Sequence, residues 1–315
     1  MPDLNSGSQI NEEQRNGGAI NGGITIETGG TNTPTNVPDL GSIKGLSSEE
    51  LQDPNKIKVE INDKKAPIVV LFGPPSCGKT MTLIRLARFL NKNNYDVRPD
   101  RSFRPSYDSH YEKMCNDFNV LVNQDEAADS TPPISFMLVK VCKNSKTLCQ
   151  ILEAPGELYF DPKYPNRSFP RYLSAIANSE ARKVWTIMVE PNWMDKSDRL
   201  NYVTKIRDLK RMMGKRDHTI IVYNKIDKTD FLIDKSGKVR MGLAMEDVGN
   251  MYEGIFNPFK NDIPVANWLV PYRFDFTAFM TGDYHEAYDG STAFEQGPDV
   301  FPKTLWEIIS DRLKG

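Results

Sequence analysis

Histidine and cysteine are scarce in this chain of 315 residues, which has three of the former and four of the latter. The histidines are scattered along the sequence, and no two cysteines form a Cys-x-x-Cys pair. Neither a zinc site nor a disulfide framework is therefore indicated. So few unpaired cysteines are typical of a reducing compartment, and we expect a cytoplasmic protein.

An excess of charge of one sign and long apolar runs are also missing. Lysine and arginine number 40 against 42 aspartates and glutamates, so the chain lacks the basic excess that holds a nucleic-acid backbone. The longest apolar run, from Ala66 to Phe72, is far shorter than the roughly 20 residues that span a bilayer. Neither end shows a signal-peptide or lipidation pattern. We expect no nucleic-acid partner and no direct membrane anchor.

Aromatic residues are absent before Phe72. Residues 1–45 are instead rich in Asn, Gly, Thr and Gln, a composition that cannot bury enough apolar surface to offset the entropy of ordering. We interpret this segment as a disordered tail. A helix-start signal follows at Ser47 to Glu50, and alternating apolar residues at 57–61 indicate a half-buried strand. The folded domain is expected over residues 55–315.

From Pro67 onward, short apolar runs alternate with longer amphipathic ones, the pattern of a mostly parallel sheet wrapped by helices. Strands are predicted at 68–72, 134–142, 147–152, 184–189, 219–223 and 272–276. Helices are predicted at 79–90, 172–181, 196–213, 244–255 and 304–313. The predicted fold class is α/β, with a mostly parallel sheet of about six strands flanked by helices. Insertions are expected at about 92–131 and 280–302, which are too long for ordinary connections.

The segment between the first of these strands and the first helix fits the phosphate-binding pattern G-x-x-x-x-G-K-[ST]. Its residues are Gly73, Pro74, Pro75, Ser76, Cys77, Gly78, Lys79 and Thr80. The glycines let backbone N–H groups turn onto phosphate oxygens, and the helix N-terminus adds the positive end of its dipole. Lys79 can reach the β and γ phosphates, and the Thr80 hydroxyl can bind Mg²⁺. The sequence therefore predicts the sheet of a P-loop NTPase, with a loop that binds a nucleoside triphosphate.

A second polar segment, Asn224-Lys225-Ile226-Asp227, follows the apolar run at 219–223 and suits a guanine base. The Asp227 carboxylate can accept hydrogen bonds from guanine N1–H and the N2 amine, whereas adenine would leave it unpaired. The stem of Lys225 can lie along the base, and Asn224 can tie this segment back to the phosphate loop. GTP and GDP are the expected ligands.

These motifs, in this order, resemble the translation-factor and Ras-like (TRAFAC) class of P-loop GTPases over residues 66 to 314. The resemblance implies that Thr131 binds Mg²⁺ in the first switch, beside Thr80. It implies that Thr277 and Ala278 form the loop in which an Ala N–H contacts guanine O6. The Asp-x-x-Gly motif of the class corresponds here to Glu153-Ala154-Pro155-Gly156. Gly156 would offer its N–H to the γ-phosphate.

Two glutamates depart from the pattern of the class. Glu153 replaces the Asp that holds Mg²⁺ through a water, and a longer carboxylate could do the same or touch the metal directly. Glu157 stands where Ras-like members carry a water-positioning Gln, and its charge is repelled by the γ-phosphate. Glu157 could activate water or have a structural or partner-facing role; with Lys79, Thr131 and Gly156 it completes the candidate catalytic set. Arg101 and Arg104, in the first insertion, are interpreted as exposed charges rather than as an arginine finger.

Three functions are compatible with these residues. The first is a guanine-nucleotide switch that binds GTP with Mg²⁺, hydrolyses it slowly and signals through mobile loops to a protein effector or activating partner. The second is a GTPase-fold scaffold in which nucleotide is bound without hydrolysis. The third is a P-loop ATPase or small-molecule kinase, which would make the segment from Asn224 to Asp227 accidental.

Overall fold

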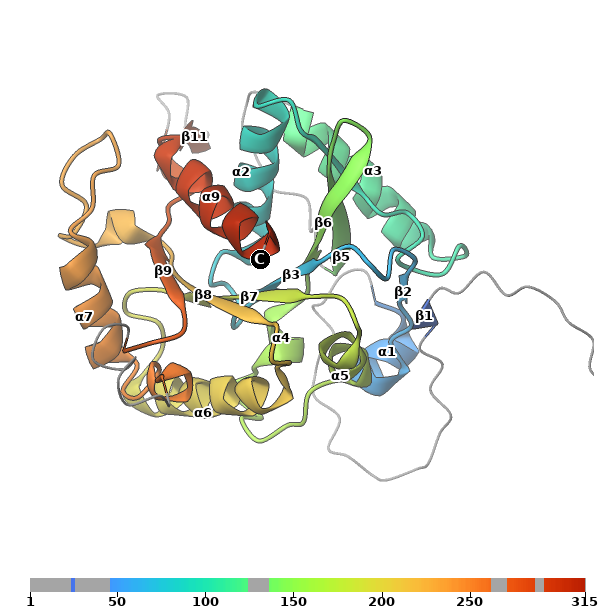
Figure 1. The fold of residues 1–315 in the computed structure, drawn as a ribbon, viewed down its shortest axis with the longest axis horizontal. Coiled ribbons are helices and arrows are strands. Elements are labelled where there is room, and N and C mark those ends of the chain that lie inside the picture. The colour runs from blue at the N-terminus through green and yellow to red at the C-terminus, as the bar shows by residue number, and fades with distance from the viewer. Residues whose placement is uncertain (1–23, 26–45, 124–135, 262–270, 287–291, 315) are drawn as a thin grey trace, which may run out of the picture.

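The computed structural model describes residues 24–25, 46–123, 136–261, 271–286 and 292–314. They form three layers, with a twisted sheet between two sets of helices (Figure 1). The main sheet has seven strands in the order β4-β5-β6-β3-β7-β8-β9. Within the described ranges, no helix combines the length and the apolar character needed to cross a membrane.

The centre of the sheet is parallel. The strands β3 (Ile68–Phe72), β6 (Lys146–Glu153), β7 (Lys183–Val189), β8 (His218–Tyr223) and β9 (Asp275–Ala278) all run in one direction. Every residue of β3 is buried, because helices cover both faces of a parallel sheet. The carboxyl ends of these strands lie at one edge, so the loops that follow them are brought together.

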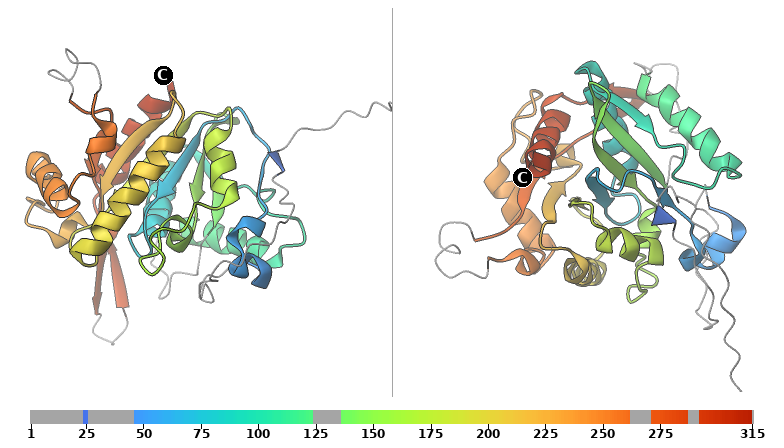
Figure 2. Two further views of the ribbon diagram at one scale, coloured as in Figure 1. Left: turned by 90° about the horizontal axis from the view of Figure 1, so that it is seen from below. Right: turned by 45° about the vertical axis from the view of Figure 1, so that its right-hand side comes forward.

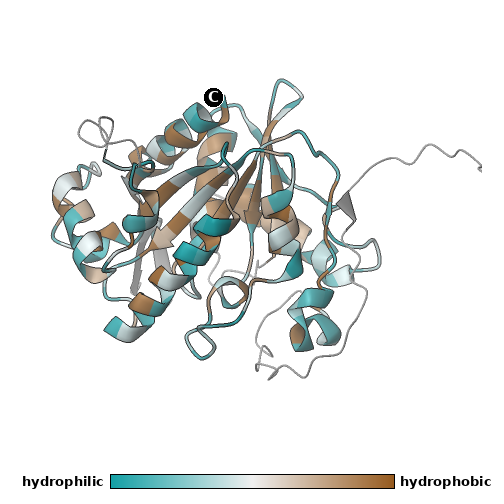
Figure 3. Ribbon diagram, turned by 60° about the horizontal axis from the view of Figure 1, so that its bottom comes forward, coloured by the Kyte–Doolittle hydropathy of each residue, from teal (hydrophilic) through white to brown (hydrophobic). Residues whose placement is uncertain are grey.

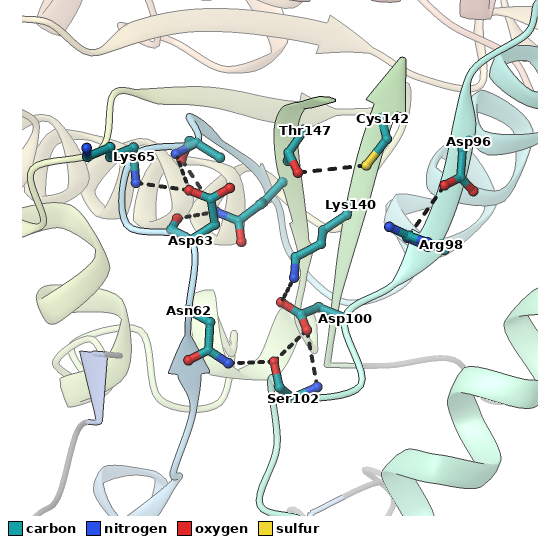
Figure 4. A network of polar contacts seen from close by, with 12 residues as sticks. Asn62, Asp63, Lys65, Asp96, Arg98, Asp100, Ser102, Lys140, Cys142 and Thr147 are labelled. Atoms are coloured by element: carbon teal, nitrogen blue, oxygen red, sulfur yellow. Dashed lines mark hydrogen bonds and ion pairs between the residues drawn. The ribbon is translucent and has the colours of Figure 1, made fainter. Parts of the chain in front are cut away.

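The other end of the sheet is antiparallel. β5 (Met137–Lys143) pairs antiparallel with β6, and β4 (Asp96–Pro99) pairs antiparallel with β5. Figure 4 shows the polar contacts at this end, where Lys140 forms an ion pair with Asp100 at 2.8 Å. Asp100 also accepts a hydrogen bond from the Ser102 hydroxyl, at 2.6 Å. These contacts hold the short strand β4 at the edge of the sheet.

One face of the sheet is covered by α2 (Lys79–Lys92), α3 (Ser109–Asn123) and α9 (Val300–Lys314), and the other by α5 (Arg171–Asn178) and α6 (Lys196–Met212) (Figures 1 and 2). Figure 3 shows apolar residues concentrated on the strands and hydrophilic residues on the outer sides of the helices. Three further helices lie in the described ranges: α1 (Ser48–Gln52), α4 (Gly156–Tyr159) and α7 (Met241–Met251). The same ranges contain the 3₁₀ turns Pro54–Lys56, Ile226–Lys228 and Asn257–Phe259. Two strand pairs lie outside the main sheet: β1 (Ile24–Thr25) with β2 (Glu60–Ile61), and β10 (Gly282–Glu286) with β11 (Thr292–Gln296).

The α/β class and the mostly parallel sheet are confirmed, and the sheet has one strand more than the sequence predicted. The additional strand is β4, which lies with α3 inside the first expected insertion; the second contains β10 and β11. The last predicted strand, 272–276, is observed slightly later, as β9 at Asp275–Ala278. The interpretation of residues 1–45 as a tail lies outside the described residues, except for 24–25.

The interpretation of Arg104 as an exposed charge was wrong. Its side chain is 4% exposed and donates to Glu50 at 2.7 Å, to Asp108 at 3.0 Å and to the Lys58 carbonyl at 2.7 Å. Burial opposes its charge, but the hydrogen bonds and charges of Glu50 and Asp108 outweigh this and raise the pKa of Arg104. The ion pair with Glu50 joins α1 to the first insertion. Arg101 is 45% exposed and pairs with Glu112.

Candidate functional site

The phosphate-binding pattern forms the connection from β3 to α2, at the carboxyl edge of the sheet. Gly78 is the N-cap of α2 and has a φ of +88°, a left-handed conformation that favours glycine. No side chain caps this helix end. The N-terminus of α2 carries the positive end of the helix dipole, which favours an anion at this position.

The ammonium of Lys79 lies inside the curve of this loop. It donates to the carbonyl oxygens of Gly73 at 3.1 Å and Pro74 at 2.9 Å, and the residue is 5% exposed. Cys77 lies beside it, with 4.0 Å between Nζ and Sγ. Burial raises the pKa of the Cys77 thiol, so Cys77 is a neutral filler next to the lysine. The positively charged end of Lys79 is thus enclosed by the backbone of the phosphate-binding loop.

Two of the glycines lie so close to neighbouring residues that a side chain would not fit. A Cβ atom on Gly78 would lie 2.3 Å from Nδ2 of Asn224, and a Cβ on Gly156 would lie 2.2 Å from the backbone N of Pro75. Neither neighbour is the end of a long flexible side chain. Gly156, at the start of α4, is therefore held directly against the phosphate-binding loop.

Thr80, in the first turn of α2, contacts Glu153, the last residue of β6. The Thr80 hydroxyl donates to Glu153 Oε1 at 3.0 Å, and the backbone N–H of Phe136 donates to Oε2 at 3.2 Å. Burial raises the pKa of Glu153, while the charge of Lys79 and the two hydrogen bonds oppose the rise. The nearby carboxylate of Glu157 adds to the rise.

The oxygen atoms of Thr80 and Glu153 form a donor set that suits a hard cation such as Mg²⁺. No cluster of three or more His, Cys, Asp or Glu side chains that could hold a metal is present in the described part of the chain. Two oxygen donors fit Mg²⁺, which is usually bound by one or two protein groups together with phosphates and waters.

The segment after β8 lies against the phosphate-binding loop. Asn224 Nδ2 donates to the Cys77 carbonyl at 2.8 Å, the contact that the sequence led us to expect. Lys225 Nζ donates to the Ser76 carbonyl at 3.0 Å. Asp227 follows in the 3₁₀ turn Ile226–Lys228 and is partly buried. The two motifs, far apart in the sequence, are thus joined by hydrogen bonds.

Thr277 and Ala278 end β9, directly beside β8, with Ala278 opposite Tyr223 in the register. The loop that follows is joined to the loop after β8, because Phe279 N–H donates to the Tyr223 carbonyl at 2.8 Å and Ile226 N–H donates to the Phe279 carbonyl at 3.2 Å. The structure therefore brings Thr277 and Ala278 to the same edge as Asn224 and Asp227.

One predicted site residue, Thr131, lies outside the described residues. Sequence reasoning also missed a residue, Glu190, which is buried at the end of β7 and forms an ion pair with Lys225. Its position could have revealed it, because it is the first charged residue after the apolar run at 184–189 and stands at the carboxyl end of a predicted strand.

No protein-family profile matches the sequence, and no curated protein does. Similar solved structures include nucleolar GTP-binding protein 1 of Plasmodium falciparum, 14% identical with a TM-score of 0.37 over 80% of this chain and 88% of that one. The GTPase-like domain of Ski7 from S. cerevisiae, bound to GDP and inorganic phosphate, is 14% identical with a TM-score of 0.41, over 80% of this chain and 51% of that one. Methanosarcina barkeri Roco2 RocCORdC, bound to GDP, is 12% identical with a TM-score of 0.30, over 79% of this chain and 50% of that one.

This chain spans about half the length of the Ski7 and Roco2 chains. Identities and TM-scores this low leave the fold to be assigned from the chain's own features. The phosphate-binding loop joins the central strand β3 to α2, and the loop from Asn224 to Asp227, which follows β8, is hydrogen-bonded to it. On these features the chain has a mostly parallel α/β fold whose central strand leads into the phosphate-binding pattern.

Proposed function

We propose that this protein is a guanine-nucleotide switch that binds GTP and GDP with Mg²⁺ and slowly hydrolyses GTP to GDP and phosphate. The observation that carries the proposal is the pair of hydrogen bonds from Asn224 to Cys77 and from Lys225 to Ser76. They support a single site in which the phosphates meet the loop from Gly73 to Thr80 while the base meets Asp227.

Selection for guanine follows from hydrogen-bond complementarity at Asp227. Its carboxylate accepts from both N1–H and the N2 amine of guanine. Adenine carries an acceptor at N1 and no amine at C2, so the partly buried carboxylate would lose its partners. In the same proposal the backbone N–H of Ala278 contacts guanine O6, and Thr277 supports that loop.

Mg²⁺ would be held by Thr80 and Glu153, with Thr131 as a further ligand in the triphosphate state. When bound, the ion neutralises charge on the β and γ phosphates. The chain's own groups orient the nucleotide: Lys79 contacts the phosphates and Gly156 donates its N–H to the γ-phosphate. A protein effector or activating partner would recognise the change in these contacts on hydrolysis.

The direct test is to identify the nucleotide released when the purified protein is precipitated by heat, using chromatography. We expect GDP or GTP. If the protein purifies without nucleotide, its thermal stabilisation by GTP and by ATP should be compared in Mg²⁺, and GTP should stabilise it more. Release of adenine nucleotide, or equal stabilisation by the two triphosphates, would contradict the proposal and favour an ATPase or kinase.

Hydrolysis by the isolated protein is expected to be slow, at or below about 10⁻² s⁻¹, the rate typical of P-loop GTPases without a partner. No Gln follows Gly156, and the two arginines considered for a finger are engaged elsewhere: Arg104 with Glu50 and Arg101 with Glu112. Glu157→Gln should leave the rate unchanged or raise it, because the change removes a charge near the γ-phosphate and supplies a water-positioning amide. Single-turnover hydrolysis of bound GTP measures this rate.

Three outcomes of that measurement would change the conclusion. A hundredfold loss in Glu157→Gln would identify Glu157 as a general base. Binding of GTP without any detectable turnover would favour the scaffold function. A partner-free rate of about 1 s⁻¹ or more would contradict a slow switch.

A further inference from the structure

The ammonium of Lys225 is held between two other loops of the site. It donates to the Ser76 carbonyl at 3.0 Å, and it forms an ion pair with the carboxylate of Glu190. Ser76 follows β3, Glu190 follows β7 and Lys225 follows β8. The lysine therefore joins three neighbouring loops at the carboxyl edge of the sheet.

Glu190 is firmly positioned for this contact. The Tyr252 hydroxyl accepts from the backbone N–H of Glu190 at 3.4 Å and donates to its carbonyl at 2.9 Å. Tyr252 is 1% exposed, and the preceding residue, Val189, accepts from Asn224 N–H at 2.8 Å. The backbone on both sides of the Glu190 side chain is thus tied to buried structure.

The carboxylate itself depends on Lys225. The Glu190 side chain is 8% exposed, and among the described residues its Oε2 has no hydrogen-bond partner besides the ion-paired ammonium. A buried carboxylate is strongly disfavoured unless a cation compensates it. Together with the hydrogen bond to Ser76, the pairing therefore fixes the end of a lysine side chain that is 31% exposed.

We propose, given the guanine site proposed above, that Glu190 is a positioning residue for the base. It holds the Lys225 ammonium over the phosphate-binding loop, so that the aliphatic stem is already extended along the face that the guanine ring occupies. Ordering this side chain before the ligand arrives removes part of the entropy loss on binding. Glu190 acts through Lys225 and does not touch the nucleotide.

The test is a double-mutant cycle on GDP affinity. Glu190→Gln preserves the size of the side chain and removes its charge. We expect the Kd for GDP to rise about tenfold or more, the effect of losing one charge-assisted hydrogen bond, mainly through faster dissociation. In a Lys225→Ala background the same Glu190→Gln change should have little further effect, because the stem to be positioned is gone.

Glu253→Gln is the matched control, because its carboxylate also pairs with a lysine, Lys196, but is 71% exposed; its GDP affinity should equal that of the wild type. Melting curves report folding, and Glu190→Asp, which keeps the charge but withdraws it by one methylene, serves as a second variant with an intermediate loss. Wild-type affinity in both Glu190 variants, or an undiminished loss in the Lys225→Ala background, would overturn the inference. A wild-type protein that binds no GDP would overturn the proposed function as well.

Discussion

Replacing Lys79 with alanine is expected to abolish measurable GTP and GDP binding. In the proposed site the ammonium leaves the carbonyls of Gly73 and Pro74 for the phosphates, or shares its three hydrogens with both. Each hydrogen bond to a charged group contributes roughly 1.5 to 3 kcal/mol, so losing two of them should weaken binding by at least about a hundredfold. Isothermal titration calorimetry with GDP and with a non-hydrolysable GTP analogue measures the loss.

Lys92→Ala gives the matched control, since Lys92 lies in the last turn of the same helix and is exposed. It should bind both nucleotides as the wild type does. Melting curves separate lost binding from lost folding, because Lys79 also closes the loop in the protein itself through its two carbonyl contacts. Full-affinity GTP binding by a folded Lys79→Ala protein would contradict the assignment of the loop.

The parts of the site that the sequence predicted depend on local patterns. An apolar run, a glycine-rich turn and an amphipathic stretch follow one another directly, and their order alone specifies β3, the loop and α2. The polar segment after β8 could be recognised in the same way. Its contact with the phosphate-binding loop was expected, and the structure shows it at the edge where the carboxyl ends of the parallel strands lie together.

Features set by long-range pairing could not be predicted from such patterns. β4 is four residues long, ends in proline and alternates exposed and buried side chains, so it becomes a strand only through pairing with β5. Arg104 and Glu190 are charged, and composition alone places charged residues at the surface. Both are buried because partners distant in the sequence, Glu50 and Lys225, compensate their charges.

Phe136 shows the same limit at the level of the backbone. It has a φ of +65°, unusual for a bulky residue, and in this conformation its N–H donates to Glu153. Its ring lies under the Arg104 guanidinium, 5.4 Å from the centroid, and packs against Tyr172. Strain of this kind is maintained only where the surrounding structure enforces it. The sequence identified Glu153 as a candidate ligand but not the strained residue that orients it.

Asp227→Ala is expected to remove the preference for guanine over adenine while leaving the phosphate contacts in place. In the proposed site the carboxylate distinguishes the two bases, because it would accept two hydrogen bonds from guanine and none from adenine. Losing them should reduce the guanine preference by about 1 to 3 kcal/mol, or roughly 5- to 150-fold. Competition between GDP and ADP for the folded protein in Mg²⁺ measures the preference directly.

Asp230→Ala tests whether the effect belongs to this position rather than to any acidic residue of the loop. Asp230 is exposed and lies three residues further along the chain, so its removal should leave both affinities unchanged. In the Asp227→Ala protein, GDP affinity should fall and ADP affinity should stay as low as in the wild type, because in the proposed site Lys79 and Thr80 contact phosphates that both nucleotides carry. Unchanged GDP affinity would mean that guanine is recognised elsewhere, and a parallel loss of both nucleotides would mean that Asp227 supports the loop instead of reading the base.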